Sequence, residues 1–354
     1  MSGLYIHIPF CERKCSYCAF YSVVSKDWKQ QKQFFQSLEK ELQNLPADFL
    51  PETIFIGGGT PTAPDFQWLE KFIPNLGKFL PQEFSCEANP GTVDAAKLAL
   101  LKRSGVNRLS IGVQSFNPQC LKTLGRIHTA EQAEEAFRLA RAAGFENISL
   151  DLIFGVPGQT MEMVESDLDR ALALDPEHIA IYNLMYEEGT PLTNLNPEKL
   201  DEDLEREMYD RIRARLKVAG FVHYEISNFA KPGFECRHNL LYWNGGEYIG
   251  VGPAAHSHWK GVRWANVSDL DDYCANGPRR EFEERLDPEA KERETLVMGL
   301  RQLAGVEVSP SLWKACEESF RSLEKEGLLV IDGRRVRLAE EALFVSDAVF
   351  AELV

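Results

Sequence analysis

The chain has 354 residues, 44% hydrophobic and 26% charged, which is typical of a globular protein of about two domains. Its net charge of −15 disfavours a protein that coats nucleic acid or an anionic membrane, and we expect no nucleic-acid partner. No apolar run approaches the roughly 18 residues of a membrane span, and the first residues do not read as a signal peptide. We therefore expect a cytoplasmic chain whose thiols stay reduced.

Apolar runs that suit buried parallel strands alternate with helical patterns in the first half of the chain. The runs cover 4–10, 53–62, 84–92, 108–116, 148–158 and 179–184. The segment 28–45 has an apolar stripe of helical spacing, and 129–144 opens with a capping box formed by Thr129 and Gln132. Six strand–helix units in series predict a parallel α/β array, either an open sheet or a barrel.

The alternation fades after a seventh strand-like run at 222–230, so we place the main domain boundary near residue 230. Aromatic-rich loops and short strands are expected over 231–275. Helical patterns at 288–303 and 309–326 precede a hairpin at 327–338, an order that resembles a winged helix. The sequence thus predicts domains at 1–230 and 231–354, the second smaller and of the α+β class.

Three of the eight cysteines, Cys11, Cys15 and Cys18, lie within "CERKCSYC" after the first strand. A tetrahedral zinc site takes four protein ligands and a disulfide takes two, so three thiols match neither. Three thiolates suit a 4Fe–4S cluster whose fourth iron is open to a small molecule. Two alternatives stay open: a zinc site completed by Cys86, Cys236 or a histidine, and three unrelated buried thiols.

Further unusual residues follow the other predicted strands. "GGGTPT" (57–62) permits close backbone approach and positive φ, and it is not a nucleotide-binding P-loop because no Gly-Lys-Ser/Thr follows. Glu87 and Asp151 are acids at the ends of apolar strands, where a ribose diol, an ammonium group, a helix cap or a salt bridge would satisfy them. In a barrel, functional residues gather at the carboxyl ends of the strands.

The cysteine spacing and these strand ends resemble the radical S-adenosylmethionine (SAM) superfamily. The resemblance implies a partial parallel (βα)6-type barrel, a 4Fe–4S cluster on Cys11, Cys15 and Cys18, and SAM on the open iron. It also implies SAM contacts from Tyr5, Tyr17, Gly58, Gly59, Thr60, Glu87, Gln114, Arg126, Asp151 and Met185.

The order "YIHIPFC", "GGGTPT", "EANPG", "GVQSF", "DLIFGVPGQT" resembles the branch that holds oxygen-independent coproporphyrinogen III oxidase (HemN) and the haem chaperone HemW. The oxidase pattern has a further cysteine where this sequence has Phe20, and it has a longer segment before the first strand. Both departures favour the chaperone family, with haem as cargo delivered to client haemoproteins. The alternative is the oxidase, which decarboxylates substrate propionates by radical chemistry.

The segment "HNLLYWNGGEYIGVGPAAHSHW" (238–259) resembles a chaperone-family motif. His238 is predicted as a haem ligand or a structural histidine, whereas structural roles are favoured for His256 and His258. Tyr242 and Trp243 offer flat apolar surface to the macrocycle. The resemblance further implies an electron donor, and membrane association only through clients.

Overall fold

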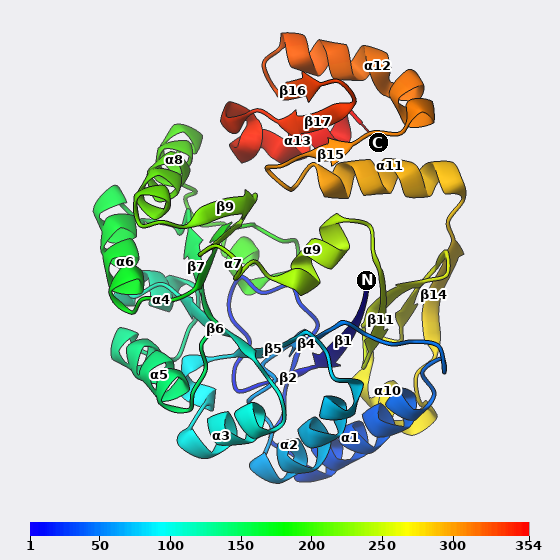
Figure 1. Cartoon of the computed structure of the whole chain (residues 1–354). Coiled ribbons are helices and arrows are strands. Elements are labelled where there is room, and N and C mark those ends of the chain that lie inside the picture. Colours follow the sequence, from blue (N-terminus) through cyan, green and yellow to red (C-terminus); the bar gives the residue numbers. More distant parts are fainter. Residues whose placement is uncertain (354) are drawn as a thin grey trace.

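The computed structural model describes residues 1–353, and through residue 183 its elements follow the alternation expected from the sequence (Figure 1). The strands are β1 (Ser2–Ile8), β2 (Phe10–Cys11), β3 (Val23–Val24), β4 (Thr53–Gly58), β5 (Glu83–Ala88), β6 (Arg108–Gln114), β7 (Ile148–Phe154), β8 (His178–Asn183), β9 (Val222–Glu225), β10 (Asn228–Ala230), β11 (Glu247–Val251), β12 (His256–Trp259), β13 (Val262–Asn266), β14 (Arg280–Arg285), β15 (Val306–Glu307), β16 (Leu329–Asp332) and β17 (Arg335–Leu338). The α-helices are α1 (Trp28–Gln43), α2 (Phe66–Phe72), α3 (Ala95–Arg103), α4 (Pro118–Thr123), α5 (Ala130–Ala142), α6 (Met161–Ala173), α7 (Pro191–Asn194), α8 (Glu202–Val218), α9 (Arg237–Trp243), α10 (Leu270–Asn276), α11 (Pro288–Gly299), α12 (Pro310–Lys325) and α13 (Ser346–Ala351). Three short 3-10 helices are η1 (Ile73–Phe79), η2 (Pro90–Thr92) and η3 (Glu340–Val345).

Six parallel strands, β1 and β4 to β8, form the centre of a curved sheet, with helices on its outer side (Figure 1). This arrangement confirms the predicted partial (βα)6 barrel. The strands carry apolar side chains toward the helices, as parallel sheets covered on their faces require. The predicted stripe of α1 packs into this core, where Phe34 and Leu38 are fully buried. The capping box of Thr129 and Gln132 opens α5 as predicted.

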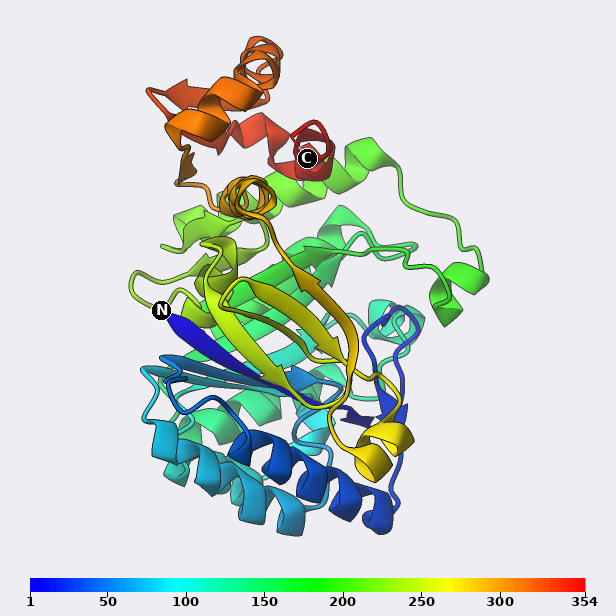
Figure 2. The same cartoon turned by 90° about the vertical axis from the view of Figure 1, so that its right-hand side faces the viewer.

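The sheet extends beyond the six central strands on both sides. On one side β11 pairs parallel to β1 and continues through β12, β13 and β14, which Figure 2 shows beside the N-terminal strand. On the other side β10 pairs antiparallel to β8, and β9 follows it. The run 222–230 is therefore two strands rather than one, because the chain reverses at Ile226 and Ser227. Since the sheet continues to residue 285, the boundary at residue 230 stays a prediction.

The last part of the chain forms a small α+β unit, drawn in orange and red at the top of Figure 1. The predicted helices are α11 and α12, and the predicted hairpin is β16 and β17, joined at Gly333 with a φ of 63°. A short strand, β15, completes its three-stranded sheet by pairing with β17. No helix within residues 1–353 is long and apolar enough to cross a membrane.

Candidate functional site

The three cysteines lie on one loop at the carboxyl end of β1. Cys11 ends β2, and Cys15 and Cys18 follow before β3; all three thiols are free and partly exposed. Ser16 anchors the loop: its amide donates to the Leu124 carbonyl at 3.1 Å and its hydroxyl donates to the Thr123 carbonyl at 2.7 Å. Gly125 permits this close approach, because a Cβ there would lie 2.9 Å from the Ser16 nitrogen.

The donor set of this loop fits an iron–sulfur cluster. Within residues 1–353, no three His, Cys, Asp or Glu side chains are arranged to hold one metal ion. A cubane cluster does not need such an arrangement, since each thiolate binds a different iron. Burial raises the pKa of the Cys11 and Cys18 thiols, so a positively charged partner is needed to keep them ionised.

Arg126 connects this loop to two strand ends. Its Nη1 donates to the Cys15 sulfur at 3.3 Å, and its Nη2 donates to the Asn89 side-chain oxygen and to the Gly112 carbonyl, each at 2.6 Å. Its buried Nε has no partner among the described residues. A cation with an unused donor beside a thiol is suited to an anionic cluster or to a carboxylate.

The glycine motif runs under the cysteine loop at the end of β4. The Gly59 and Thr60 amides donate to the carbonyls of Ile8 and Phe10 at 2.9 and 2.8 Å. A Cβ at Gly59 would lie 2.7 Å from the Pro9 backbone, so only glycine fits there. The buried Thr60 hydroxyl lies 3.6 Å from the Cys11 sulfur and accepts a hydrogen bond from the Asn89 side chain at 2.7 Å.

Gln114 ends β6 at an irregularity of the β6–β7 pairing, with a φ of 67°. A non-glycine residue in this left-handed region is strained, and such strain is common at functional sites. The side chain lies near Arg126, since a Cβ added at Gly112 would approach both residues. The structure thus brings Gln114 and Arg126 together, as the resemblance implies for groups that bind the SAM carboxylate.

Glu87 and Asp151 face the barrel interior, where they line a cavity of about 200 Å³ with Tyr5. Burial, helped by the nearby Asp151 carboxylate, raises the pKa of Glu87 to about 8. Burial also raises the pKa of Asp151, although Ser110 and Ser149 donate hydrogen bonds to its oxygens. Asp151 is the fourth residue of β7, so it lies deeper in the barrel than the predicted strand end.

Tyr17 is part of the cysteine loop, and Met185 lies just after the carboxyl end of β8. Tyr17 packs against an apolar cluster that includes Leu124 and Leu192, and Leu192 donates its amide to the Ser16 carbonyl. Met185 follows β8 and is 63% exposed. Both positions are compatible with the predicted SAM contacts, which stay predictions.

The residues predicted for haem lie elsewhere, on α9. His238 is 1% exposed, and both ring nitrogens are engaged, Nδ1 with the Thr53 hydroxyl at 2.8 Å and Nε2 with the Tyr242 hydroxyl at 2.9 Å. Since Thr53 begins β4, His238 lies at the amino ends of the strands, opposite the cysteine loop. Trp243 stacks under the Arg301 guanidinium at 4.5 Å. The structure does not bring these residues to the cysteine loop, and it favours a structural role for His238.

Two residues of the interior, Asn89 and Arg108, are not among those that the sequence predicts for the site. Asn89 bridges Thr60 and Arg126, and its position two residues after Glu87 in "EANPG" was the available signal. Arg108 begins β6 and lines the barrel cavity while being 2% exposed. The only indication in the sequence that Arg108 lies in the interior is that a charged residue begins an apolar strand.

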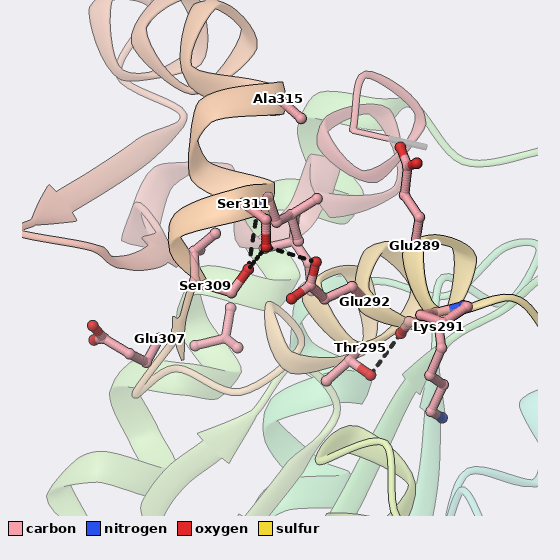
Figure 3. Close-up of a pocket in the computed structure, with 13 residues that line it drawn as sticks. Glu289, Lys291, Glu292, Thr295, Glu307, Ser309, Ser311 and Ala315 are labelled. Atoms are coloured by element: carbon pink, nitrogen blue, oxygen red, sulfur yellow. Dashed lines mark hydrogen bonds between the residues drawn. The ribbon is translucent and has the colours of Figure 1, made fainter. Parts of the chain in front are cut away.

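A second cavity, of about 710 Å³, lies in the C-terminal unit between α11, β15 and α12 (Figure 3). Ser309 and Ser311 share a hydrogen bond of 2.9 Å, and Ser311 donates to Glu292. None of the predicted site residues lines it.

A partial parallel barrel with a three-cysteine loop and a glycine-rich strand end defines a radical SAM protein. Residues 5–171 match the Radical SAM superfamily, and residues 286–345 match the HemN C-terminal domain. The fold is similar to that of a solved coproporphyrinogen III oxidase, HemN from Escherichia coli, with a TM-score of 0.84 and 21% identity over 99% of this chain and 89% of that one.

Relatives that match most of the chain show which family within the superfamily it belongs to. The chain is 36% identical to a protein named heme chaperone HemW from Lactococcus lactis, over 100% of this chain and 97% of the relative. It is 40% identical to the protein of that name from Bacillus subtilis, over 92% of this chain and 88% of the relative, and 41% identical to the one from Escherichia coli, over 72% and 69%. The chain belongs to the HemW family within the radical SAM superfamily, and this membership implies a 4Fe–4S cluster and SAM.

Proposed function

We propose that the chain is a cytoplasmic haem carrier on a radical SAM scaffold, and that it delivers haem to client haemoproteins. The observation that carries the proposal is its similarity along the whole length to a relative named as a heme chaperone. Phe20 supports it, because this position follows the third cysteine by two residues and carries an exposed phenyl ring instead of the further thiol of the oxidase pattern.

In this proposal Cys11, Cys15 and Cys18 hold the cluster. The Arg126 guanidinium offsets negative charge beside Cys15, and Asn89 fixes that guanidinium by accepting its second hydrogen bond. The cluster that these three cysteines would hold would supply the electron that cleaves the sulfonium of SAM, so an electron donor is a further proposed partner. Gln114 and Arg126 would orient the SAM carboxylate, while Tyr17 would pack beside the adenine.

Haem carriage needs an accessible imidazole or another axial ligand. His256 is exposed, and it follows the loop after the carboxyl end of β11, which runs parallel to β1. It therefore lies toward the same end of the sheet as the cysteine loop. We propose His256 rather than the buried His238 as the ligand to test, with removal expected to weaken haem binding.

Coproporphyrinogen III oxidase is the second candidate function, favoured by the fold similarity to HemN and by the shared barrel. An anaerobic assay separates the two: reconstituted chain, SAM, a reductant and coproporphyrinogen III are incubated, and tetrapyrroles are separated by chromatography. The proposal predicts no protoporphyrinogen above the level of a Cys15→Ala control. Repeated turnover would make the chain an oxidase.

Delivery is tested by mixing the haem-loaded chain with a haem-free haemoenzyme of the same cell and following recovery of that enzyme's activity. The matched comparison is an equal amount of haem bound to albumin. Faster recovery from the chain is expected. Equal rates of recovery from the haem-loaded chain and from haem–albumin would contradict the proposed delivery function.

A further inference from the structure

Arg108 is a buried cation without a bonded partner. It is 2% exposed, and its Nε makes no hydrogen bond within residues 1–353. Within residues 1–353 its side chain forms no salt bridge; burial lowers its pKa, and the charges of nearby groups, among them Cys236, Glu83 and Asp151, raise it. A buried charge is costly unless it is paired, so this arginine requires an explanation.

The two nearby carboxylates are already engaged with other donors. Glu83 accepts hydrogen bonds from the backbone amides of Arg237 and His238 at 2.9 and 3.0 Å. Asp151 accepts from the hydroxyls of Ser110 and Ser149 at 2.9 and 3.1 Å. These bonds hold both acids in place, and neither acid forms the fork-to-fork pair that arginine makes with a free carboxylate.

Arg108 lines the interior cavity of about 200 Å³, and Asn228 and Asn239 line it as well. The cavity opens to solvent, because Tyr182, which also lines it, is 43% exposed. Drug-sized ligands occupy cavities of about 300–1,000 Å³, so this one suits a smaller ligand or one arm of a larger one. The rings of Phe55 and Tyr182 and the methyl group of Ala180 supply apolar surface for a short alkyl chain.

Tyr5, Glu87 and Asp151, which are predicted SAM contacts, line the same cavity, but Arg108 lies apart from the residues predicted to bind the SAM carboxylate. Arg108 begins β6 and Gln114 ends it, so their backbones lie six residues, or about 20 Å, apart along the strand. The ligand is more suitably a carboxylate than a phosphate, because the Asp151 carboxylate in the same lining repels a second negative charge.

We propose that Arg108 binds the carboxylate of a small ligand, a carboxyl group on a short aliphatic arm, inside the barrel cavity. The source is either a free short-chain carboxylate or a propionate arm of a porphyrin; only the second source rests on the proposed haem function.

The test uses the reconstituted full-length chain and sodium propionate, with binding followed by saturation-transfer NMR. Propionate should bind saturably, whereas neutral propionamide should not. Arg108→Gln should raise the Kd about tenfold or more, because it removes a charge-assisted pair. Arg103→Gln, a change at an exposed arginine of α3, should leave the Kd unchanged. Absence of saturable propionate binding, or equal Kd values for Arg108→Gln and the unchanged chain, would overturn the proposal.

A second variant covers the case in which Arg108→Gln fails to fold. Ala180→Leu keeps the arginine and fills the cavity, so it should also weaken propionate binding. Unchanged binding would contradict the proposed binding site in the barrel cavity.

Comparing haem with haem dimethyl ester distinguishes a porphyrin propionate from a free carboxylate as the ligand. If Arg108→Gln weakens binding of haem but not of the ester, the arm belongs to the porphyrin. If only propionate binding changes, the ligand is a free carboxylate. Because the propionate titration contains no haem, failure of haem carriage would leave this inference standing.

Discussion

The Arg126 guanidinium lies 3.3 Å from the Cys15 sulfur, measured from Nη1 to Sγ, and Asn89 holds the same guanidinium from the other side at 2.6 Å. This relationship joins the cysteine loop to the end of β5. Hydrogen bonds to cluster sulfurs stabilise the reduced, more negative cluster and thereby raise its reduction potential.

Replacing Arg126 by Lys should therefore lower the reduction potential of the cluster by tens of millivolts, because the single nitrogen of a lysine side chain cannot take the places of both Nη1, which contacts Cys15, and Nη2, which contacts Asn89 and Gly112. A redox titration followed by electron paramagnetic resonance measures this potential. Arg138→Lys on the exposed side of α5 is the matched control. If both variants give the potential of the unchanged chain, the contact with Cys15 does not tune the cluster.

Changing Cys11, Cys15 or Cys18 to Ala should abolish cluster assembly, since each thiolate binds a separate iron. Iron content and visible absorption after anaerobic reconstitution measure the loss. Cys274→Ala provides the control, because Cys274 is also free and partly exposed but lies on α10. Retention of a full cluster by any of the three variants would show that its thiol is not a ligand.

His238→Ala should destabilise the fold, because it leaves the Thr53 and Tyr242 hydroxyls unpaired in the interior. We expect a loss of about 1–3 kcal/mol per unpaired group in urea unfolding. His256→Ala should change the free energy of unfolding by less than about 0.5 kcal/mol, as is usual for an exposed side chain.

The same two variants decide the haem ligand. Haem affinity should fall in His256→Ala and persist in the folded fraction of His238→Ala, as measured by difference spectroscopy. The reverse result would restore His238 as the ligand, and it would mean that α9 rearranges when haem binds.

Glu87 makes stability depend on pH. Its pKa rises from the ordinary 4.5 to about 8 through burial and the neighbouring Asp151 carboxylate. A carboxyl with a raised pKa favours the folded state in its protonated form, so stability is lost as pH rises from about 4.5 through 8. Each pKa unit corresponds to about 1.4 kcal/mol, and water in the cavity screens part of that cost.

Glu87→Gln should abolish this dependence and make the protein more stable than the unchanged chain at pH 9, by about 2 kcal/mol, with little difference at pH 5. Urea midpoints at the two pH values measure it. Parallel pH profiles for both proteins would mean that Glu87 is ionised in the folded state at neutral pH.

The left-handed backbone conformation of Gln114 is strained. Two substitutions distinguish the contribution of its side chain to SAM binding from the effect of its backbone conformation on stability. Gln114→Gly and Gln114→Ala both remove the amide and should weaken SAM binding alike. The glycine variant should be more stable than the alanine variant by about 1 kcal/mol, because glycine adopts a φ of 67° freely. If both variants bind SAM as tightly as the unchanged chain does, Gln114 does not contribute to SAM binding.

Much of the fold could be predicted because its signals are local. Apolar runs predicted the six central strands to within a few residues, and the spacing of Cys11, Cys15 and Cys18 pointed to one loop, on which the structure places all three. The edges of the sheet could not be predicted in the same way. The pairing of β11 with β1 joins residues about 245 positions apart, and nothing in either segment specifies its partner.

The interior of the site was less predictable for a related reason. The place of His238 depends on Thr53, a residue 185 positions away, so the motif alone left its role open. Arg108 and Asn89 act through contacts between different strands, and each is unremarkable in its own segment. Asp151 lies within β7 because Leu152 to Phe154 continue the strand beyond it.

Haem carriage is tested first by an anaerobic titration of the reconstituted, full-length chain with haem, followed by difference spectroscopy. A haem carrier should bind one haem per chain saturably, with a Kd in the micromolar range or below and an intact cluster at the end point. A linear, unsaturable signal equal to that of a protein without haem affinity would contradict the claim that this chain carries haem.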